Sequence, residues 1–268
     1  MSKTIGFIGC GNMGQAMIGG IIQANIFSSE NILVGDVNEK SLEKAAEKYG
    51  IKTTTDNNEV AKIADILILS VKPNLYPVVI KQIKDEVKKD VIVVTIAAGK
   101  SIEGTEKMFK RKVKVVRVMP NTPALVGEGM SAVCANEAVT KEELDEIINI
   151  FESFGKTEIV NEKLMDVVTS VSGSSPAYVY MFIEAMGDAA VLDGMPRNKA
   201  YKMAAQAVLG AAKMVLETGM HPGVLKDMVC SPGGTTIEAV ATLEEKGLRT
   251  AVISAMRSCT KKSIEMSK

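Results

Sequence analysis

Short apolar runs alternate with longer amphipathic stretches over the first 160 residues of the chain. β-branched side chains dominate these runs, which occupy residues 4–9, 31–36, 64–71, 90–96 and 113–118. Runs that are apolar throughout, without polar alternation, are typical of strands buried on both faces of a sheet. Helical patterns such as residues 38–50 separate the runs, so the order predicts a parallel, doubly wound α/β sheet.

Two weaker strands follow in the same half of the chain, at residues 130–136 and 156–160. The helical pattern between them begins at Thr140, and Glu143 three positions later completes a capping-box signature. We therefore expect the first domain to cover residues 1–161.

The pattern changes after Asn161, where strand-like runs give way to long stretches rich in alanine and methionine. Gly219 and Gly247 occupy C-cap positions in this region, which predicts helices at residues 176–192, 198–218, 235–246 and 249–267. Residues 176–217 are apolar around nearly the whole helix circumference, as in helices buried on all sides. We expect Tyr178, Met181 and Phe182 to lie in a core. A second, all-α domain of residues 162–268 is too small to bury so much surface alone, which predicts an intertwined homodimer.

Composition and charge exclude several classes of partner. The 268 residues contain 32 basic and 32 acidic side chains, so nothing indicates nucleic acid or a membrane surface. The N-terminal apolar stretch is too short for a signal peptide, and the most apolar later region carries Glu184, Asp188 and Asp193. The four cysteines lack disulfide or zinc-site spacing, so we expect reduced thiols in a cytoplasmic protein and no bound metal.

A glycine-rich segment follows the first apolar run. Gly9, Gly11 and Gly14 have the G-x-G-x-x-G spacing of dinucleotide-binding turns, and a helical pattern begins directly after them. This order predicts a Rossmann-type domain that binds a pyrophosphate at the helix N-terminus. Asp36 ends the second run, where an acidic side chain accepts hydrogen bonds from ribose hydroxyls and repels a 2′-phosphate. Local chemistry therefore favours NADH, and a helix N-cap is the alternative role for Asp36.

A second glycine-rich loop, residues 230–236, precedes a helical pattern in the second domain. Gly233 and Gly234 should leave backbone N–H groups unpaired at a helix N-terminus, an arrangement that suits a carboxylate. The alternative interpretation of this loop is a capped helix start without a ligand. The usual proton donors of dehydrogenases are absent, because the only histidine, His221, precedes Pro222 in an expected loop and no tyrosine has a lysine four residues on. A protonated C=N bond carries its own positive charge, so this absence favours an imine substrate.

Six segments together resemble the pyrroline-5-carboxylate reductases, the enzymes of the last step of proline biosynthesis. They follow the family's order and occupy residues 5–14, 70–74, 115–130, 171–186, 193–214 and 221–244. The last segment is highly specific, and the resemblance covers essentially the whole chain. It implies reduction of 1-pyrroline-5-carboxylate to L-proline by NADPH or NADH. It also implies a helical domain that interlocks with a second subunit, in a dimer from which larger rings are built in some members.

The resemblance implies roles for individual residues. Together with Gly14 and Asp36, the implied cofactor contacts are Ile8, Gly9, Cys10, Gly11, Asn12, Met13, Asn57, Val71, Lys72, Pro73, Ala97, Ala98, Gly99, Met119, Pro120 and Asn121. The substrate carboxylate is held by Ser231, Gly233, Gly234 and Thr235, and Thr236 supplies or relays the proton to the ring nitrogen. The family's active site lies where the nicotinamide of one subunit meets the helical domain at the dimer interface. Many members have serine or arginine at the position of Asp36 and prefer NADPH, so resemblance and local chemistry disagree about the cofactor.

Two other functions remain open from the sequence. A β-hydroxyacid dehydrogenase has a similar two-domain build but relies on a lysine in the first helices of its second domain, and residues 170–191 contain none. A non-catalytic dinucleotide sensor would bind the cofactor without reducing an imine, and it would have no evident use for the loop at residues 230–236.

Overall fold

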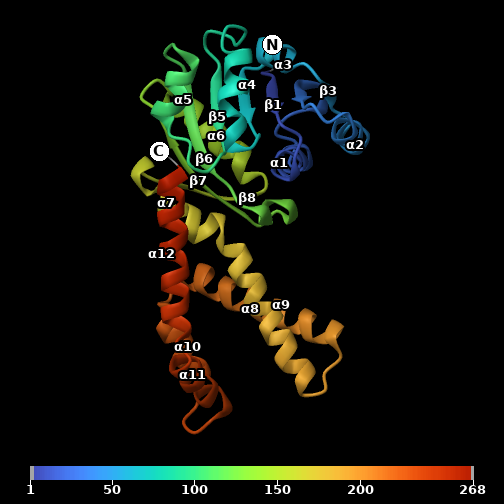
Figure 1. Cartoon of the computed structure of the whole chain (residues 1–268). Coiled ribbons are helices and arrows are strands. Elements are labelled where there is room, and N and C mark those ends of the chain that lie inside the picture. The colour runs from blue at the N-terminus through green and yellow to red at the C-terminus, as the bar shows by residue number, and fades with distance from the viewer. Residues whose placement is uncertain (1–2, 267–268) are drawn as a thin grey trace. The chain divides into compact units, whose positions relative to one another are not determined.

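The computed structural model describes residues 3–266, which divide into two compact units (Figure 1). The first unit comprises the described residues up to Ser174 together with those from Cys259 onward, and the second comprises Ser175–Ser258. The boundary expected after residue 161 stays a prediction drawn from the change in sequence pattern. In the structure, residues 162–174 belong to the first unit.

An eight-stranded sheet forms the centre of the first unit. The strands lie in the order β3-β2-β1-β4-β5-β6-β7-β8. In that order they are Lys52–Thr54, Ile32–Gly35, Ile5–Ile8, Ile66–Leu69, Ile92–Thr95, Lys114–Met119, Gly129–Ala135 and Gly155–Ile159. Every neighbouring pair is parallel except β6 and β7. The Rossmann-type α/β fold is confirmed, and each of the five main apolar runs identified in the sequence coincides with one of these strands to within a residue or two at either end.

The apolar runs predicted a sheet that is parallel throughout, and the observed sheet differs from this expectation in two features. The hydropathy pattern does not predict β3, because this edge strand has the polar sequence KTT and is only partly buried. β7 runs antiparallel to β6, because the two strands are joined by a short connection that holds only the 3₁₀ helix Thr122–Val126. A parallel return needs a longer crossover, usually a full α-helix.

Helices cover both faces of the sheet, as strands without polar alternation require. Along β4, Ile66 and Ile68 belong to the apolar cluster of one face, and Leu67 and Leu69 to that of the other. The first face is covered by α1 (Asn12–Gln23), α2 (Glu39–Tyr49) and α6 (Lys141–Glu152), and the second by α3 (Asn57–Ile63), α4 (Tyr76–Ile83) and α5 (Ile102–Phe109). The predicted capping box of α6 is confirmed: Thr140 Oγ1 accepts from the Glu143 backbone, and the Glu143 carboxylate accepts from the Thr140 backbone.

The first unit also contains a short helical segment after β8. It consists of the 3₁₀ helix Glu162–Leu164, α7 (Met165–Val168) and a π-helical turn at Thr169–Gly173. The last turns of α12 (Leu248–Met266) return to this segment. Ser263 donates to the Asp166 carboxylate at 2.6 Å, and Thr260 donates to Ser170 Oγ at 2.9 Å. These bonds place the end of α12 with the cofactor-binding fold.

The second unit is entirely helical, as the sequence pattern predicts. It contains α8 (Ser175–Leu192), α9 (Arg197–Thr218), α10 (Pro222–Val229), α11 (Thr235–Glu245) and the first part of α12. Gly219 ends α9 with a φ of 63°, and Gly247 follows α11 with a φ of 75°, a backbone region that glycine adopts without strain. The predicted end of the last helix, at residue 267, lies outside the described residues.

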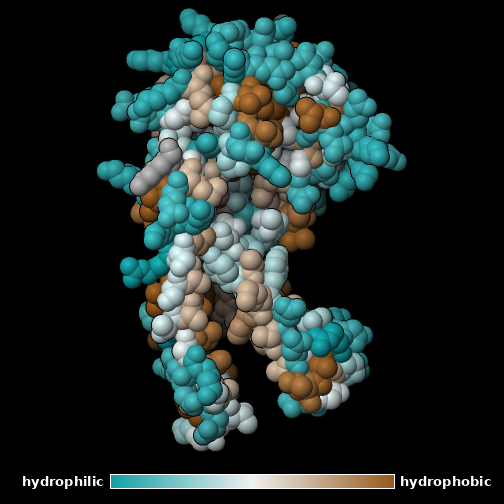
Figure 2. Space-filling view, in the orientation of Figure 1, coloured by the Kyte–Doolittle hydropathy of each residue, from teal (hydrophilic) through white to brown (hydrophobic). Residues whose placement is uncertain are grey.

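Much of the apolar surface of the second unit is exposed in a single chain (Figure 2). The residues of α8 and α9 that are buried are Gly187, Ala200 and Ala204. By contrast, Met181 is 69% exposed and Phe182 is 43% exposed. The expectation that these two side chains lie in a core is therefore wrong for the chain alone. Helices that are apolar on all sides need another surface to cover them, which a second copy of the chain would supply.

Candidate active site

A cavity of about 470 Å³ lies at the carboxyl ends of β1, β2 and β4. β2 and β3 lie on one side of β1 in the sheet, and β4 and the later strands lie on the other side. Open α/β sheets bind ligands at such a topological switch point. The residues expected to bind the cofactor that line this cavity are Ile8, Gly9, Gly11, Asp36, Asn57, Val71 and Lys72. Residues that the glycine fingerprint and the family resemblance assign to the cofactor thus lie around one cavity.

The three fingerprint glycines have three different structural roles. Gly9 has a φ of 109°, and a Cβ there would lie 2.6 Å from the Ser70 carbonyl oxygen. A Cβ on Gly14 would lie 2.6 Å from the Gly9 carbonyl oxygen, so this glycine lets α1 begin against the turn. A Cβ on Gly11 would meet no protein atom within 4 Å, although Gly11 lines the cavity. Gly11 thus leaves open space that a pyrophosphate can approach, and the cavity fits a dinucleotide at this point.

The N-terminus of α1 is available to an anion. Gly11 is its N-cap residue, and no side chain within residues 3–266 caps the first turn. The N–H groups of Asn12 and Met13 therefore have no capping partner, and the dipole of a 12-residue helix favours negative charge at this end. Cys10 differs from its neighbours in the loop, because its side chain is buried and its Sγ lies 3.5 Å from the Ser41 carbonyl oxygen.

Two polar side chains at strand ends hold the glycine turn in place. The Asp36 carboxylate accepts from the backbone N–H groups of Cys10 at 2.6 Å and Asn38 at 2.9 Å. Ser70, at the end of β4, has its Oγ 2.6 Å from the Gly9 carbonyl oxygen. Asn38, not Asp36, caps α2, so the alternative N-cap role for Asp36 is wrong. The sequence interpretation missed Ser70, although a serine that directly follows an apolar run was a usable signal.

The expected cofactor residues Cys10, Asn12, Met13 and Gly14 belong to the glycine turn and the start of α1 but are not among the residues that line this cavity. Seven others end or follow β4, β5 and β6 and do not line it either. Pro73 begins a 3₁₀ helix after β4, Ala97, Ala98 and Gly99 follow β5, and Met119, Pro120 and Asn121 end or follow β6. The Asn121 side chain donates to the Ser172 carbonyl at 3.0 Å and accepts from the Met130 N–H at 2.9 Å. This amide is therefore already used within the fold, and the Asn121 carbonyl accepts from the Ala124 N–H at 3.2 Å.

The second glycine loop has the features of a carboxylate site. Gly233 has a φ of 66°, and the Gly234 N–H donates to the Ser231 carbonyl at 3.0 Å, which closes a tight turn directly before α11. Gly234 is the N-cap residue of α11, and in the part of the chain that the structure describes no side chain caps this helix. Thr235 and Thr236 are its first two residues. The turn therefore brings free N–H groups and hydroxyl groups together at one helix end.

His221 has a structural role in the same unit. Its Nδ1 accepts from the Gly223 N–H at 3.0 Å and so caps α10. Its Nδ1 is therefore occupied by this cap, which agrees with the expectation from the sequence that His221 is not the proton donor.

Two cysteines of the first unit are expected to be chemically inert. Burial raises the pKa of the Cys10 thiol to about 11, with a smaller contribution from the Asp36 charge. Burial also raises the pKa of Cys134 to about 11. Since the thiolate is the reactive form, we expect both residues to stay unmodified by a thiol reagent at pH 8 in the native protein and to react after denaturation. Peptide mass spectrometry measures this, and equal labelling of native and denatured protein would contradict it.

Comparison with known proteins identifies the family. A family model described as Pyrroline-5-carboxylate reductase dimerisation matches residues 162–266, and one described as NADP oxidoreductase coenzyme F420-dependent matches residues 4–99. The pyrroline-5-carboxylate reductase of Escherichia coli (strain K12) is 53% identical over 268 residues, with 100% of both chains covered. The chain belongs to the pyrroline-5-carboxylate reductase family.

Further relatives agree with this assignment. The reductase of Methanosarcina acetivorans is 46% identical, over 100% of this chain and 99% of its own. The crystal structure of a Plasmodium falciparum pyrroline carboxylate reductase with NADP bound matches with a TM-score of 0.92 at 34% identity, over 100% of this chain and 99% of that chain. The resemblance noted in the sequence is confirmed, and this reductase is an oxidoreductase of proline biosynthesis.

The same matches bear on the assembly of this reductase. The segment that matches the dimerisation model contains the exposed apolar helices α8 and α9, which supports a homodimer. Within residues 3–266, no cluster of three or more histidine, cysteine, aspartate or glutamate side chains is placed to hold a metal ion. None of the helices in this part of the chain has the length and hydropathy needed to cross a bilayer.

Proposed function

We propose that this chain reduces 1-pyrroline-5-carboxylate to L-proline with the residues assigned from its sequence. Identity of 53% along the full length of a pyrroline-5-carboxylate reductase carries the proposal. The uncapped N-terminus of α11 behind the Gly233–Gly234 turn supports it, because the substrate has one carboxylate to be bound.

The cofactor half of the proposal rests on the cavity beside the glycine turn. The free N–H groups at the start of α1 would hold the pyrophosphate, and Asp36 would accept hydrogen bonds from the adenosine ribose. The exposed side chains of Val37 and Val78 line the same cavity and offer apolar contact for the adenine ring. When bound here, a reduced nicotinamide dinucleotide supplies a hydride.

The substrate half rests on the loop before α11. The Thr235 N–H and the hydroxyl of Ser231 would bind the substrate carboxylate, and Gly233 and Gly234 would shape the turn that holds it. Thr236 would hold its hydroxyl at the ring nitrogen and supply or relay the proton that this nitrogen keeps in the amine product. A hydroxyl is a weak acid, but a protonated C=N bond is already electrophilic, so positioning contributes more than acid strength.

A working site requires the homodimer in this proposal. The resemblance locates the family's active site where the nicotinamide of one subunit meets the helical domain at the dimer interface. Assemblies of several dimers, a cytoplasmic location and the absence of nucleic-acid and membrane partners are further parts of the proposal. The even balance of 32 basic and 32 acidic side chains supports the last of these.

The first test is an assay of the purified protein with 1-pyrroline-5-carboxylate. We expect rapid loss of nicotinamide absorbance with NADH and with NADPH, and proline as the product. A β-hydroxyacid in place of the imine is the control for the dehydrogenase alternative. Binding of the cofactor without any oxidation by the imine would contradict the proposal and favour the sensor alternative.

Asp36 is proposed to set the cofactor preference, with NADH used at least as well as NADPH. Its carboxylate lines the cavity, and its charge opposes a 2′-phosphate. Replacing Asp36 with serine should raise the ratio of kcat/KM for NADPH to that for NADH at least about tenfold, equivalent to about 1.4 kcal/mol. Glu43→Gln removes one exposed charge from α2 and serves as the control. An unchanged ratio in the Asp36 variant, or an equal shift in the control, would contradict this role.

A further inference from the structure

A buried cation lies in the first unit, outside the cavity already described. Arg117 of β6 is only 4% exposed and lies on the apolar side of the sheet that also contains Met119 and Cys134. Burial of a guanidinium group is unfavourable unless its charge and its N–H groups are paired. Arg117 therefore needs a partner for its charge within the fold.

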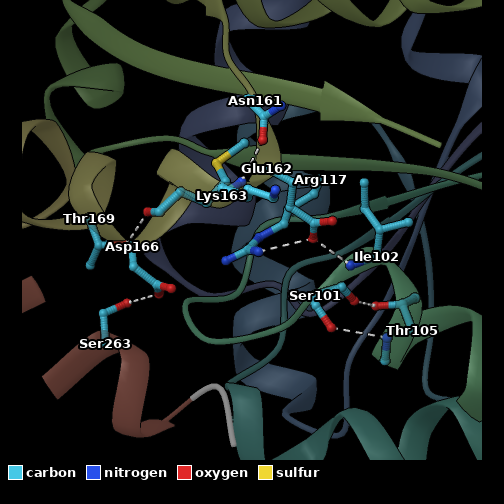
Figure 3. Close-up of polar contacts among 12 residues, drawn as sticks. Ser101, Ile102, Thr105, Arg117, Asn161, Glu162, Lys163, Asp166, Thr169 and Ser263 are labelled. Atoms are coloured by element: carbon cyan, nitrogen blue, oxygen red, sulfur yellow. Dashed lines mark hydrogen bonds and ion pairs between the residues drawn. The ribbon is translucent and has the colours of Figure 1, made fainter. Parts of the chain in front are cut away.

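Glu162 pairs with this cation and also binds a helix end. Its Oε1 accepts from Arg117 Nη1 at 3.1 Å and from the Ile102 N–H at 2.7 Å. Figure 3 shows the carboxylate between the guanidinium group and the first turn of α5. One carboxylate oxygen thus joins β6, the N-terminus of α5 and the start of the segment that follows β8.

The pair is not arranged for maximum stability. Within residues 3–266, Nε and Nη2 of Arg117 are buried and have no hydrogen-bond partner. Buried donors without partners are rare in folded proteins, and a buried ion pair is often replaceable by apolar side chains without loss of stability. An apolar side chain at position 117 would suit the surrounding cluster at least as well. Stability alone therefore gives no reason for an arginine here.

The location of the pair offers a different reason. Arg117 precedes Met119, Pro120 and Asn121, and Ile102 follows the loop that contains Ala97, Ala98 and Gly99. These are the loops after two neighbouring parallel strands, β5 and β6, at the edge of the sheet where ligands bind.

The other end of the β5 loop is also fixed by buried polar groups. The Tyr76 hydroxyl lies 2.7 Å from the Leu69 carbonyl oxygen and 3.0 Å from Thr95 Oγ1. In the middle of the loop, Gly99 has a φ of 72°, and a Cβ there would lie 3.0 Å from the Met266 carbonyl oxygen of α12. The loop is thus held at both ends and against the end of α12.

We propose that Arg117 and Glu162 are positioning residues for hydride transfer, and that their ion pair holds the loops after β5 and β6 in the one arrangement that seats the nicotinamide ring. The proposal rests on the proposed function, since it takes these loops to be the nicotinamide contacts. Neither residue touches the reacting atoms. They act through Ile102 and through the strand that carries Met119.

The deciding experiment removes both charges while it keeps the space filled. In Arg117→Met/Glu162→Gln, methionine fills the buried volume and glutamine still offers an acceptor to the Ile102 N–H. We expect a melting temperature and a dimer content close to those of the wild type. We expect kcat to fall at least about tenfold while the Kd of NADH changes by less than about threefold, because the cavity at β1, β2 and β4 is untouched. The fluorescence of bound NADH, which reports the surroundings of the nicotinamide ring, should also change.

Three further variants complete the test. Arg117→Met alone covers the case in which the double variant fails to fold, because the Glu162 carboxylate that it leaves is partly exposed and still accepts from the Ile102 N–H. Arg117→Lys should have a kcat between those of the double variant and the wild type. Lysine keeps the positive charge, but it lacks the planar, forked donors of the guanidinium group. Glu103→Gln/Lys107→Met removes an exposed ion pair from the same helix α5 and should leave kcat unchanged.

The outcomes separate the two proposals. A folded, dimeric double variant with wild-type kcat overturns the positioning role, as does a fall in kcat that only matches a loss of folded dimer. If the wild type itself fails to reduce 1-pyrroline-5-carboxylate, the proposed function is overturned first, and the positioning role with it.

Discussion

Replacing Thr236 with valine should lower the turnover number for 1-pyrroline-5-carboxylate by about 10²–10⁴, the usual contribution of a positioned proton donor. Valine has nearly the same shape as threonine and keeps the β-branch, so the start of α11 should form as before. Only the hydroxyl is lost, and with it the proposed proton source for the ring nitrogen. The Kd of NADH should stay the same, because the groups proposed to hold its pyrophosphate and ribose belong to the other unit and are unchanged.

Steady-state kinetics and a fluorescence titration of NADH measure the two parts of this expectation. Thr242→Val is a matched control, because Thr242 lies on the same helix and its hydroxyl donates to the Glu238 carbonyl, one turn earlier. A turnover number within about threefold of the wild type would show that another group, or water, supplies the proton. An equal loss in the control variant would assign the effect to the helix and not to the hydroxyl.

Replacing Gly9 with alanine should weaken NADH binding at least about tenfold, equivalent to about 1.4 kcal/mol or more. The backbone at this position has a φ of 109°, where an alanine is strained, and the new Cβ would lie 2.6 Å from the Ser70 carbonyl oxygen. Strain of this kind costs roughly 1–3 kcal/mol, so the free energy of unfolding should fall as well. The turn moves because the end of β4 is fixed within the sheet, and the N–H groups that face the pyrophosphate move with it.

Isothermal titration with NADH and thermal melting test this second expectation. Gly50→Ala is the control, because Gly50 also has a positive φ, 64°, but the nearest atom to its added Cβ is 3.9 Å away and the residue ends α2 away from the cavity. The control should lose some stability and keep its affinity for NADH. Wild-type affinity in the Gly9 variant would show that the tight contact with Ser70 is not needed for cofactor binding.

Local patterns were enough to predict most elements of the fold. The continuous apolar runs predicted β1, β2, β4, β5 and β6, because strands covered on both faces carry no polar alternation. The capping box at Thr140 and Glu143 marked the start of α6. β3 was not predicted, because a three-residue edge strand buries too little surface to need a hydrophobic pattern.

The candidate site was predictable to the extent that it depends on residues close together in sequence. Gly9, Gly11 and Gly14 form one turn, and the loop at residues 231–236 forms another. Ser70 holds the first turn from β4, some sixty residues away along the chain. No spacing rule indicates such a contact, because it exists only once β1 and β4 pair in register.

The sequence by itself determined the class of fold, the two glycine turns and the family of this protein, because periodicity, turn chemistry and family motifs are all local properties of the chain. Only the tertiary structure showed that Asp36 and Ser70 hold the cofactor turn and that Arg117 and Glu162 form a buried pair beside α5. Those contacts join strands and helices that are far apart in sequence. Their energies depend on burial and on distances of a few ångströms, and these quantities exist only after the sheet and its helices have packed.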